Sequence, residues 1–139
     1  MKPYSRTVQY YETDQMGIVH HSNYIRYFEE ARMDLWDQAG LDYHQMEKEG
    51  ILVPVLACSC RYKKPLRFPQ RFSVEVSLTD FNGVRFHVAY RIFAEGESIP
   101  SAVGQSEHCF ADKSMHPIRI EKRYPHILGK VQAITLKRD

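Results

Sequence analysis

Residues 10–24 read Tyr10-Tyr11-Glu12-Thr13-Asp14-Gln15-Met16-Gly17-Ile18-Val19-His20-His21-Ser22-Asn23-Tyr24, and the rest of the chain is organised around this stretch. It combines an acidic residue in an expected turn, a glycine shortly after it, and the start of a predicted helix about seven positions beyond the acid. Ser22 or Asn23 can cap that helix, because their side-chain oxygens accept backbone N–H groups that lack partners within the helix. The stretch therefore predicts a carboxylate, Asp14, close to a helix N-terminus.

The predicted helix runs from this capping position through Trp36 and ends at Gly40, whose type favours a left-handed conformation after a helix. Its apolar side recurs every three to four residues. The stripe comprises Tyr24, Ile25, Phe28, Ala31, Arg32, Leu35, Trp36 and Ala39. About 16 residues at ~1.5 Å each give roughly 25 Å, so the helix can cross a whole small sheet.

A carboxylate beside a helix N-terminus suggests acyl transfer. The first N–H groups of a helix are unsatisfied and carry the positive end of its dipole, so they can polarise a carbonyl oxygen. A carboxylate on the other side of that carbonyl can attack it or activate a water molecule. The alternative is structural, because an Asp before a glycine-containing turn often bonds its own backbone.

The motif Glu12-Thr13-Asp14-x-x-Gly17-Ile18-Val19-x-His21-x-Asn23-Tyr24-x-x-x-x-Glu29-x-Ala31-Arg32 resembles the signature of the 4-hydroxybenzoyl-CoA thioesterase family. It is most similar to the acyl-CoA thioesterase branch associated with the bacterial Tol-Pal system. The resemblance is close over residues 10–32 and looser over the rest of the chain. It implies an α+β hotdog fold, in which one domain, residues 1–139, wraps an antiparallel sheet around a long central helix.

The same resemblance implies an acyl-CoA thioesterase that releases a carboxylic acid and free CoA without a cofactor or a metal. Asp14 would be the general base or the nucleophile, and these two roles stay open. The backbone N–H at His21 would bind the thioester carbonyl, and its imidazole is a second candidate group. Relatives are homodimers or homotetramers with active sites between subunits, so the same is expected here.

Further residues are expected to bind substrate. Gly17 lets the backbone approach a ligand closely, with Ile18 and Val19 beside it. Tyr10 and Tyr24 are candidates to border the acyl pocket, although an aromatic residue in this setting is more often part of the core. Cations after a predicted strand could hold the CoA phosphates or simply form a solvated surface. They are Lys63, Lys64 and Arg67.

The rest of the chain is predicted to be mainly extended. Strands are expected at 4–11, 51–62, 71–81, 85–94 and 99–112, with a helical turn at 43–48. Pro54 predicts a sheet edge or a bulge, and Asn82-Gly83 predicts a hairpin turn. The tail, residues 113–139, is basic, and Pro125 can start a short helix within it.

Composition narrows the class of function. A net charge of +2 and a pI of about 8.4 are too mild to suggest nucleic acid binding. No apolar run reaches the ~18 residues of a membrane span, and no signal peptide is evident, which predicts a cytoplasmic protein. Its three cysteines, Cys58, Cys60 and Cys109, suit a reducing compartment.

The remaining candidate residues, the two adjacent histidines and a charged pair on the helix, are interpreted as structural. The adjacent His20 and His21 lack a third ligand, so no metal site is expected. Glu29 and Arg32 lie on one helix face and could pair. Some hotdog enzymes use a helix glutamate as the catalyst, but here the acid that matches the motif is Asp14.

Two other functions stay open at this point. A hotdog dehydratase or hydratase would act on 3-hydroxyacyl or enoyl thioesters with a His and an acid. A non-catalytic acyl-CoA-binding protein would keep the pocket without needing the carboxylate. The sequence decides neither the acyl preference nor whether the carrier is CoA or acyl carrier protein.

Overall fold

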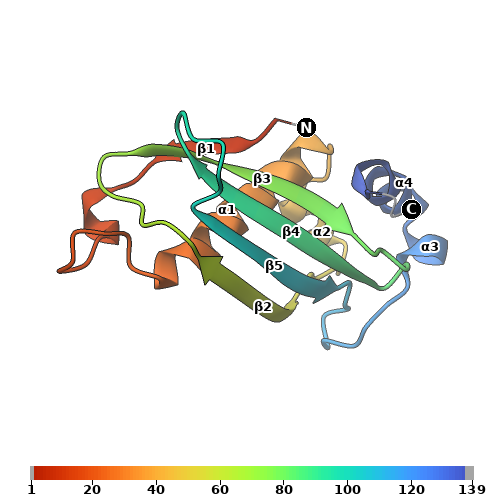
Figure 1. Cartoon of the computed structure of the whole chain (residues 1–139). Coiled ribbons are helices and arrows are strands. Elements are labelled where there is room, and N and C mark those ends of the chain that lie inside the picture. Colours follow the sequence, from red (N-terminus) through yellow and green to blue (C-terminus); the bar gives the residue numbers. More distant parts are fainter. Residues whose placement is uncertain (1, 137–139) are drawn as a thin grey trace.

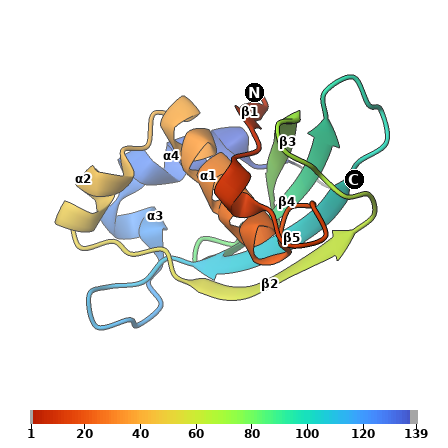
Figure 2. The ribbon, with the colours of Figure 1, turned by 90° about the vertical axis from the view of Figure 1, so that its left-hand side faces the viewer.

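The computed structural model describes residues 2–136, which form a five-stranded antiparallel sheet curved around one long helix (Figures 1 and 2). The strand order is β1-β3-β4-β5-β2. The strands are β1 (Tyr4–Thr7), β2 (Val55–Tyr62), β3 (Arg71–Thr79), β4 (Arg85–Ala94) and β5 (Ala102–Cys109). This architecture confirms the predicted α+β class, because the helix and the inner face of the sheet bury each other's apolar side chains.

The long helix α1 (Ser22–Gln38) lies across the concave face of the sheet, as the apolar stripe predicts (Figure 2). Gly40 ends it with a φ of +75°. The helix buries Tyr24, Tyr27, Phe28, Ala31, Leu35 and Trp36. Stacking of Phe28 on Tyr90 of β4, with ring centroids 4.3 Å apart, ties the middle of the helix to the middle of the sheet.

The predicted cap of this helix is wrong. His21 occupies the N-cap position with helical backbone angles, and no side chain caps the helix. The Ser22 hydroxyl lies 2.8 Å from the His20 ring, and the Asn23 amide donates to the Glu12 carbonyl at 2.8 Å. Both side chains therefore bond to preceding residues rather than to the first turn of their own helix.

Strands β3 and β4 carry much of the core, because alternate side chains along each strand point to the inner face of the sheet, where Val76 is partly buried. The inward side chains Phe72, Val74, Leu78, Phe86, Val88, Tyr90 and Ile92 are all buried. The loop between the two strands spans residues 80–84, where Gly83 has a φ of +96°. It is longer than a two-residue hairpin, because Asn82 accepts the N–H groups of Val84 and Arg85 with its own side chain.

Three strands besides β2 are shorter than predicted. The first, expected at 4–11, ends at Thr7, and residues 10–12 form a 3₁₀ turn, η1 (Tyr10–Glu12), because the Glu12 carboxylate accepts the Gln9 N–H. The strand expected at 71–81 ends at Thr79. The last, expected at 99–112, spans Ala102–Cys109, since its pairing with β4 stops at Arg85, where β4 itself begins.

Strand β2 begins at Val55 rather than at residue 51 and lies at the sheet edge, paired with β5. Its register shifts between Val55 and Ala57, directly after Pro54, as expected for a proline at a sheet edge. Val55, Leu56 and Tyr62 are 45–50% exposed. The apolar composition of this segment therefore reflects a sheet edge and not a buried strand.

Three short helices lie toward the end of the sheet away from the segment that leads into α1 (Figure 1). They are α2 (Tyr43–Lys48), α3 (Ile120–Arg123) and α4 (Pro125–Ile134). Pro125 starts α4 as predicted, although the helix is longer than a single turn. One buried core runs from Val8 to Val131. The domain predicted over residues 1–139 also includes residues 1 and 137–139, which lie outside the described part.

Candidate active site

The segment between η1 and α1 is a tight turn that holds Asp14. The Asp14 N–H donates to the Ile18 carbonyl, the Gly17 N–H donates to the Asp14 carbonyl, and both distances are 2.9 Å. Gly17 has a φ of +78°, a conformation that favours glycine. The Val19 N–H then donates to the Leu66 carbonyl at 2.8 Å. The turn is thus fixed at both ends.

The Asp14 carboxylate is itself held in place. Its Oδ1 accepts the Met16 N–H at 2.8 Å, which is the structural role that the sequence leaves open. No donor within residues 2–136 is assigned to Oδ2. One oxygen therefore orients the group while the other is available to a ligand or a water molecule.

The start of α1 presents a backbone N–H without a partner. The His20 N–H donates to the Glu12 carbonyl at 2.9 Å, and the Ser22 N–H donates to the His20 ring at 3.2 Å. Within the described chain, no acceptor is assigned to the N–H of His21, which lies between them. Because this group is at the positive end of a helix of 17 residues, it can bind a carbonyl oxygen.

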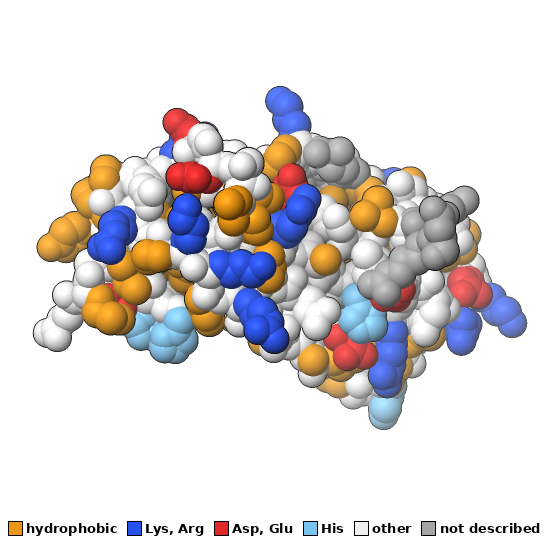
Figure 3. Space-filling model, viewed as in Figure 1, with side chains coloured by type: hydrophobic (Ala, Val, Ile, Leu, Met, Phe, Trp, Pro, Cys, Tyr) orange, Lys and Arg blue, Asp and Glu red, His pale blue; other side chains and the backbone are white. Residues whose placement is uncertain are grey.

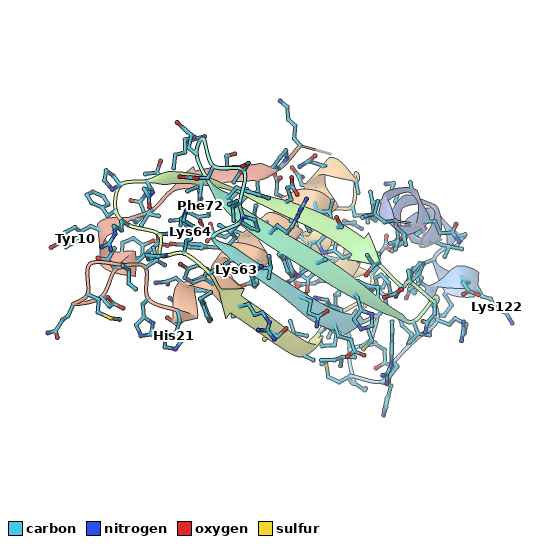
Figure 4. The ribbon with its side chains drawn as sticks, viewed as in Figure 1. Tyr10, His21, Lys63, Lys64, Phe72 and Lys122 are labelled. Atoms are coloured by element: carbon cyan, nitrogen blue, oxygen red, sulfur yellow. The ribbon has the colours of Figure 1, made fainter. Side chains whose placement is uncertain are left out.

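A cavity of about 350 Å³ brings the carboxylate and this helix start together. It is lined by Asp14, Met16, Ile18, Val19, His21, Tyr24, Tyr62, Lys63, Lys64 and Pro65. Seven of the residues predicted to be catalytic or substrate-binding are in this set. Figure 4 shows His21 at the same end of the molecule as the chain leading out of β2, which carries Lys63 and Lys64.

Three other predicted residues lie outside this lining. Tyr10 is 76% exposed, and its ring packs edge-on against Phe68 with centroids 5.6 Å apart. Gly17 and Arg67 lie together, with Arg67 Nη1 3.5 Å from the Gly17 carbonyl oxygen. Arg67, in the segment that follows β2, thus lies close to the turn that holds Asp14.

Aromatic rings form one wall of the cavity. Tyr24 is buried and meets Tyr62 edge-on at 4.9 Å, while the Tyr62 hydroxyl donates to the His21 carbonyl at 3.3 Å. Burial raises the pKa of Tyr24 and of Tyr62, so both phenols stay protonated. Sequence reasoning does not identify Tyr62 as a site residue. Its position just before Lys63 and Lys64 at the end of a strand is the only signal there.

Glu29 and Arg32 lie farther along α1 and line a separate cavity of about 140 Å³ with Val55 and Cys58 of β2. Arg32 donates to the Tyr90 hydroxyl at 2.8 Å, so its firm contact is with the sheet rather than with Glu29. The helix glutamate is therefore not part of the cavity that holds Asp14.

Within residues 2–136, no three His, Cys, Asp or Glu side chains are grouped so that they could hold a metal ion. No helix in this part combines the length and the apolar character that crossing a bilayer requires.

Comparison with known proteins agrees with this geometry. Residues 8–128 match the thioesterase-like superfamily. The Bacillus subtilis protein YneP, provisionally named an acyl-CoA thioesterase, is 36% identical over 118 residues, which are 85% of this chain and 86% of that protein. A 1,4-dihydroxy-2-naphthoyl-CoA hydrolase of Thermosynechococcus vestitus is 31% identical over 109 residues, which are 78% of this chain and 74% of the hydrolase.

Solved structures give the same result. The DHNA-CoA thioesterase of Staphylococcus aureus superposes with a TM-score of 0.89 at 30% identity, covering 95% of this chain and 89% of that one. The central helix and the curved antiparallel sheet are consistent with the match to the family model. The chain therefore belongs to the thioesterase-like superfamily of hotdog-fold hydrolases.

Proposed function

We propose that this chain hydrolyses acyl-CoA thioesters to a carboxylic acid and free CoA, with Asp14 as the reacting carboxylate. One observation carries the proposal: Asp14, whose Oδ2 has no assigned donor in residues 2–136, and His21, whose backbone N–H has no assigned acceptor there, line one cavity. The relatives named as CoA-thioester hydrolases support the same substrate class. The narrower placement in the 4-hydroxybenzoyl-CoA family, in its Tol-Pal-associated branch, belongs to this proposal and rests on the motif alone.

In the proposed reaction, the thioester carbonyl oxygen accepts the His21 N–H. Negative charge that develops on this oxygen is stabilised by that N–H and by the helix dipole behind it. Asp14 then either removes a proton from an attacking water or attacks the carbonyl carbon itself. In the second case the CoA thiolate leaves the resulting tetrahedral intermediate, which gives an acyl-aspartyl anhydride, and water then cleaves this anhydride to the acid and the free carboxylate.

The CoA nucleotide is expected to lie toward the cationic side chains after β2. Lys63 and Lys64 line the cavity, and Arg67 lies close to the turn that holds Asp14. Figure 3 shows Lys and Arg side chains gathered on this side of the sheet, over the end nearer the cavity. Lys and Arg bind phosphate well, so these residues should lower KM rather than raise kcat.

A homo-oligomer is the expected form of the enzyme, as a homodimer or a homotetramer. The β2 edge supports this proposal, because it combines unpaired backbone groups with exposed Val55, Leu56 and Tyr62. Tyr62 also lines the Asp14 cavity, so a second subunit at this edge would lie next to the acyl group. The predicted cytoplasmic location and the absence of a cofactor complete the proposal.

The test is release of free thiol from a panel of short-chain, long-chain, benzoyl and 1,4-dihydroxy-2-naphthoyl CoA thioesters. Wild type should hydrolyse at least one, and Asp14→Asn should lose roughly 100-fold or more in kcat, because it removes the base or nucleophile at constant size. Asp37→Asn, an exposed carboxylate of α1, is the matched control and should keep full activity.

Three results would contradict the proposal. Asp14→Asn that stays folded and keeps its kcat would remove Asp14 from the chemistry and direct attention to Glu29. Hydration of crotonyl-CoA without thiol release would indicate a hydratase instead of a thioesterase. A protein that cleaves no member of the panel but binds acyl-CoA would be a binding protein, with acyl carrier protein thioesters as the remaining substrates to try.

A further inference from the structure

One backbone carbonyl connects the two parts of the proposed active site. The Glu12 carbonyl oxygen accepts the His20 N–H at 2.9 Å and the Asn23 side-chain amide at 2.8 Å. Glu12 lies two residues before Asp14, and Asn23 lies two residues after His21. The segment that carries the carboxylate is therefore bonded directly to the first turn of the helix that carries the free N–H.

Glu12 is itself fixed within the core. It is 4% exposed, and its Oε1 accepts Arg6 Nη2 at 2.6 Å and the Gln9 N–H at 2.7 Å. Arg6 Nη1 also contacts both carboxylate oxygens of Glu30 on α1 at 2.9 Å. The Arg6 guanidinium bonds both Glu12 of η1 and Glu30 of α1. These bonds fix the position of the Glu12 backbone, and so of its carbonyl, relative to the helix.

The orientation of the Asn23 side chain is determined at both ends. Its NH₂ group donates to Glu12, and its Oδ1 accepts Arg26 Nη1 at 3.4 Å. Asn23 is only 7% exposed, so its amide has little access to water as an alternative partner. An asparagine at a helix start would usually bond its own first turn, which here it does not.

We propose that Asn23 is a positioning residue that sets the separation between the Asp14 carboxylate and the His21 N–H. This inference rests on the proposed function, because it assigns a role only if those two groups act on the same thioester. When the Asn23 bond is lost, the Glu12 carbonyl still accepts the His20 N–H, so the fold should be kept. The distance between the Asp14 carboxylate and the His21 N–H should change. Binding of the CoA moiety, by contrast, depends on residues that Asn23 does not contact.

The experiment compares Asn23→Ala and Asn23→Asp with the wild type on whichever acyl-CoA is hydrolysed fastest. We expect kcat to fall roughly 10- to 100-fold in Asn23→Ala with KM changed less than about threefold, since a small misplacement of reacting groups has an effect of this size. Asn23→Asp should be at least as slow, because it sets a carboxylate oxygen against the Glu12 carbonyl oxygen.

The matched control is Tyr90→Phe. It removes the Tyr90 hydroxyl, and with it the bond from Arg32 of α1 to the sheet and the buried bond between Tyr90 and Ser106, without touching the Asp14 turn. We expect its kcat to equal that of the wild type. If Tyr90→Phe and Asn23→Ala lower kcat equally at similar thermal stability, Asn23 acts through general stability and the proposal is overturned.

A double variant provides the readout that a purely structural role would not change. If Asn23 acts by positioning Asp14, adding Asn23→Ala to Asp14→Asn should lower kcat by less than about threefold more. Full additivity would overturn the inference, as would an active wild type whose Asn23→Ala variant keeps its kcat. A wild type that cleaves no thioester would instead overturn the proposed function, and this inference with it.

Discussion

His108 should make the protein lose stability as the pH falls through the range of histidine titration. The side chain is fully buried, and its ring stacks on Phe86 with centroids 5.1 Å apart. Its Nε2 lies 2.6 Å from the Ser106 hydroxyl, which lies 2.6 Å from the Tyr90 hydroxyl. Tyr90 in turn accepts Arg32 Nη1.

The arginine at one end of this chain of hydrogen bonds can only donate, so the Tyr90 oxygen accepts from Arg32. The hydroxyls of Tyr90 and Ser106 can each donate or accept, so a neutral His108 ring can bond Ser106 through Nε2 in either tautomer. A charged ring carries N–H groups at both nitrogens, and within residues 2–136 no hydrogen-bond partner is assigned to Nδ1. Burial first, and then the nearby Arg32 charge, lower the pKa of His108 to about 4.

The sign and size of the pH effect follow from this pKa. In the unfolded chain histidine titrates near ~6.5, so above that pH neither state binds the proton and the folded state pays no penalty. Between about 6.5 and about 4 only the unfolded state is protonated, which destabilises the fold by a total of about 3 kcal/mol. Below the folded pKa this contribution is constant.

Urea unfolding of the wild type and of His108→Gln at pH values from 4 to 7.5 measures the effect. The difference in unfolding free energy between the two proteins should shrink as the pH falls, because the variant has no proton to gain at this position. Carboxylates and the exposed histidines titrate alike in both proteins and cancel in the difference. Parallel profiles over the whole range would refute the reasoning.

Three further changes test other parts of the structure. His21→Pro removes a backbone N–H at a residue whose φ of −55° suits proline, so kcat should fall roughly 100-fold, while His21→Ala keeps that N–H and should lose less. Equal losses would contradict the proposed oxyanion site. Gly104→Ala drives a new Cβ into the Phe28 ring and should lower the unfolding free energy by roughly 1–3 kcal/mol, seen as a lower urea midpoint. Arg6→Met leaves the Glu12 carboxylate buried without its cation and should cost about 3 kcal/mol in the same assay, part of which Glu12→Gln should restore.

Much of the fold is predictable from the sequence because the helical and the strand patterns of apolar residues mark the two faces that pack together. The three-to-four spacing of α1 and the alternation of β3 and β4 describe the two apolar faces that pack together, as in the stack of Phe28 on Tyr90. β2 is the exception. Pro54 predicts an edge or a bulge near its start, but which strand it pairs with follows from strand order, which periodicity does not contain.

The candidate site is predictable in its residues but not in its contacts. Asp14, His21, Tyr24 and the two lysines after β2 do line one cavity. Tyr62 is missed, because an aromatic residue in a predicted strand carries no local sign of its cross-chain neighbour. Its contact with Tyr24 is made across 38 residues of chain, and only the pairing of β2 with β5 places it there.

The failed cap at the start of α1 has the same kind of cause and a functional implication. Local rules favour Ser22 or Asn23 bonding the first N–H groups of the helix, but a tertiary partner, the Glu12 carbonyl, takes the Asn23 amide instead. The departure from the local rule ties the start of α1 to the segment that carries Asp14, and functional sites are where such departures are expected.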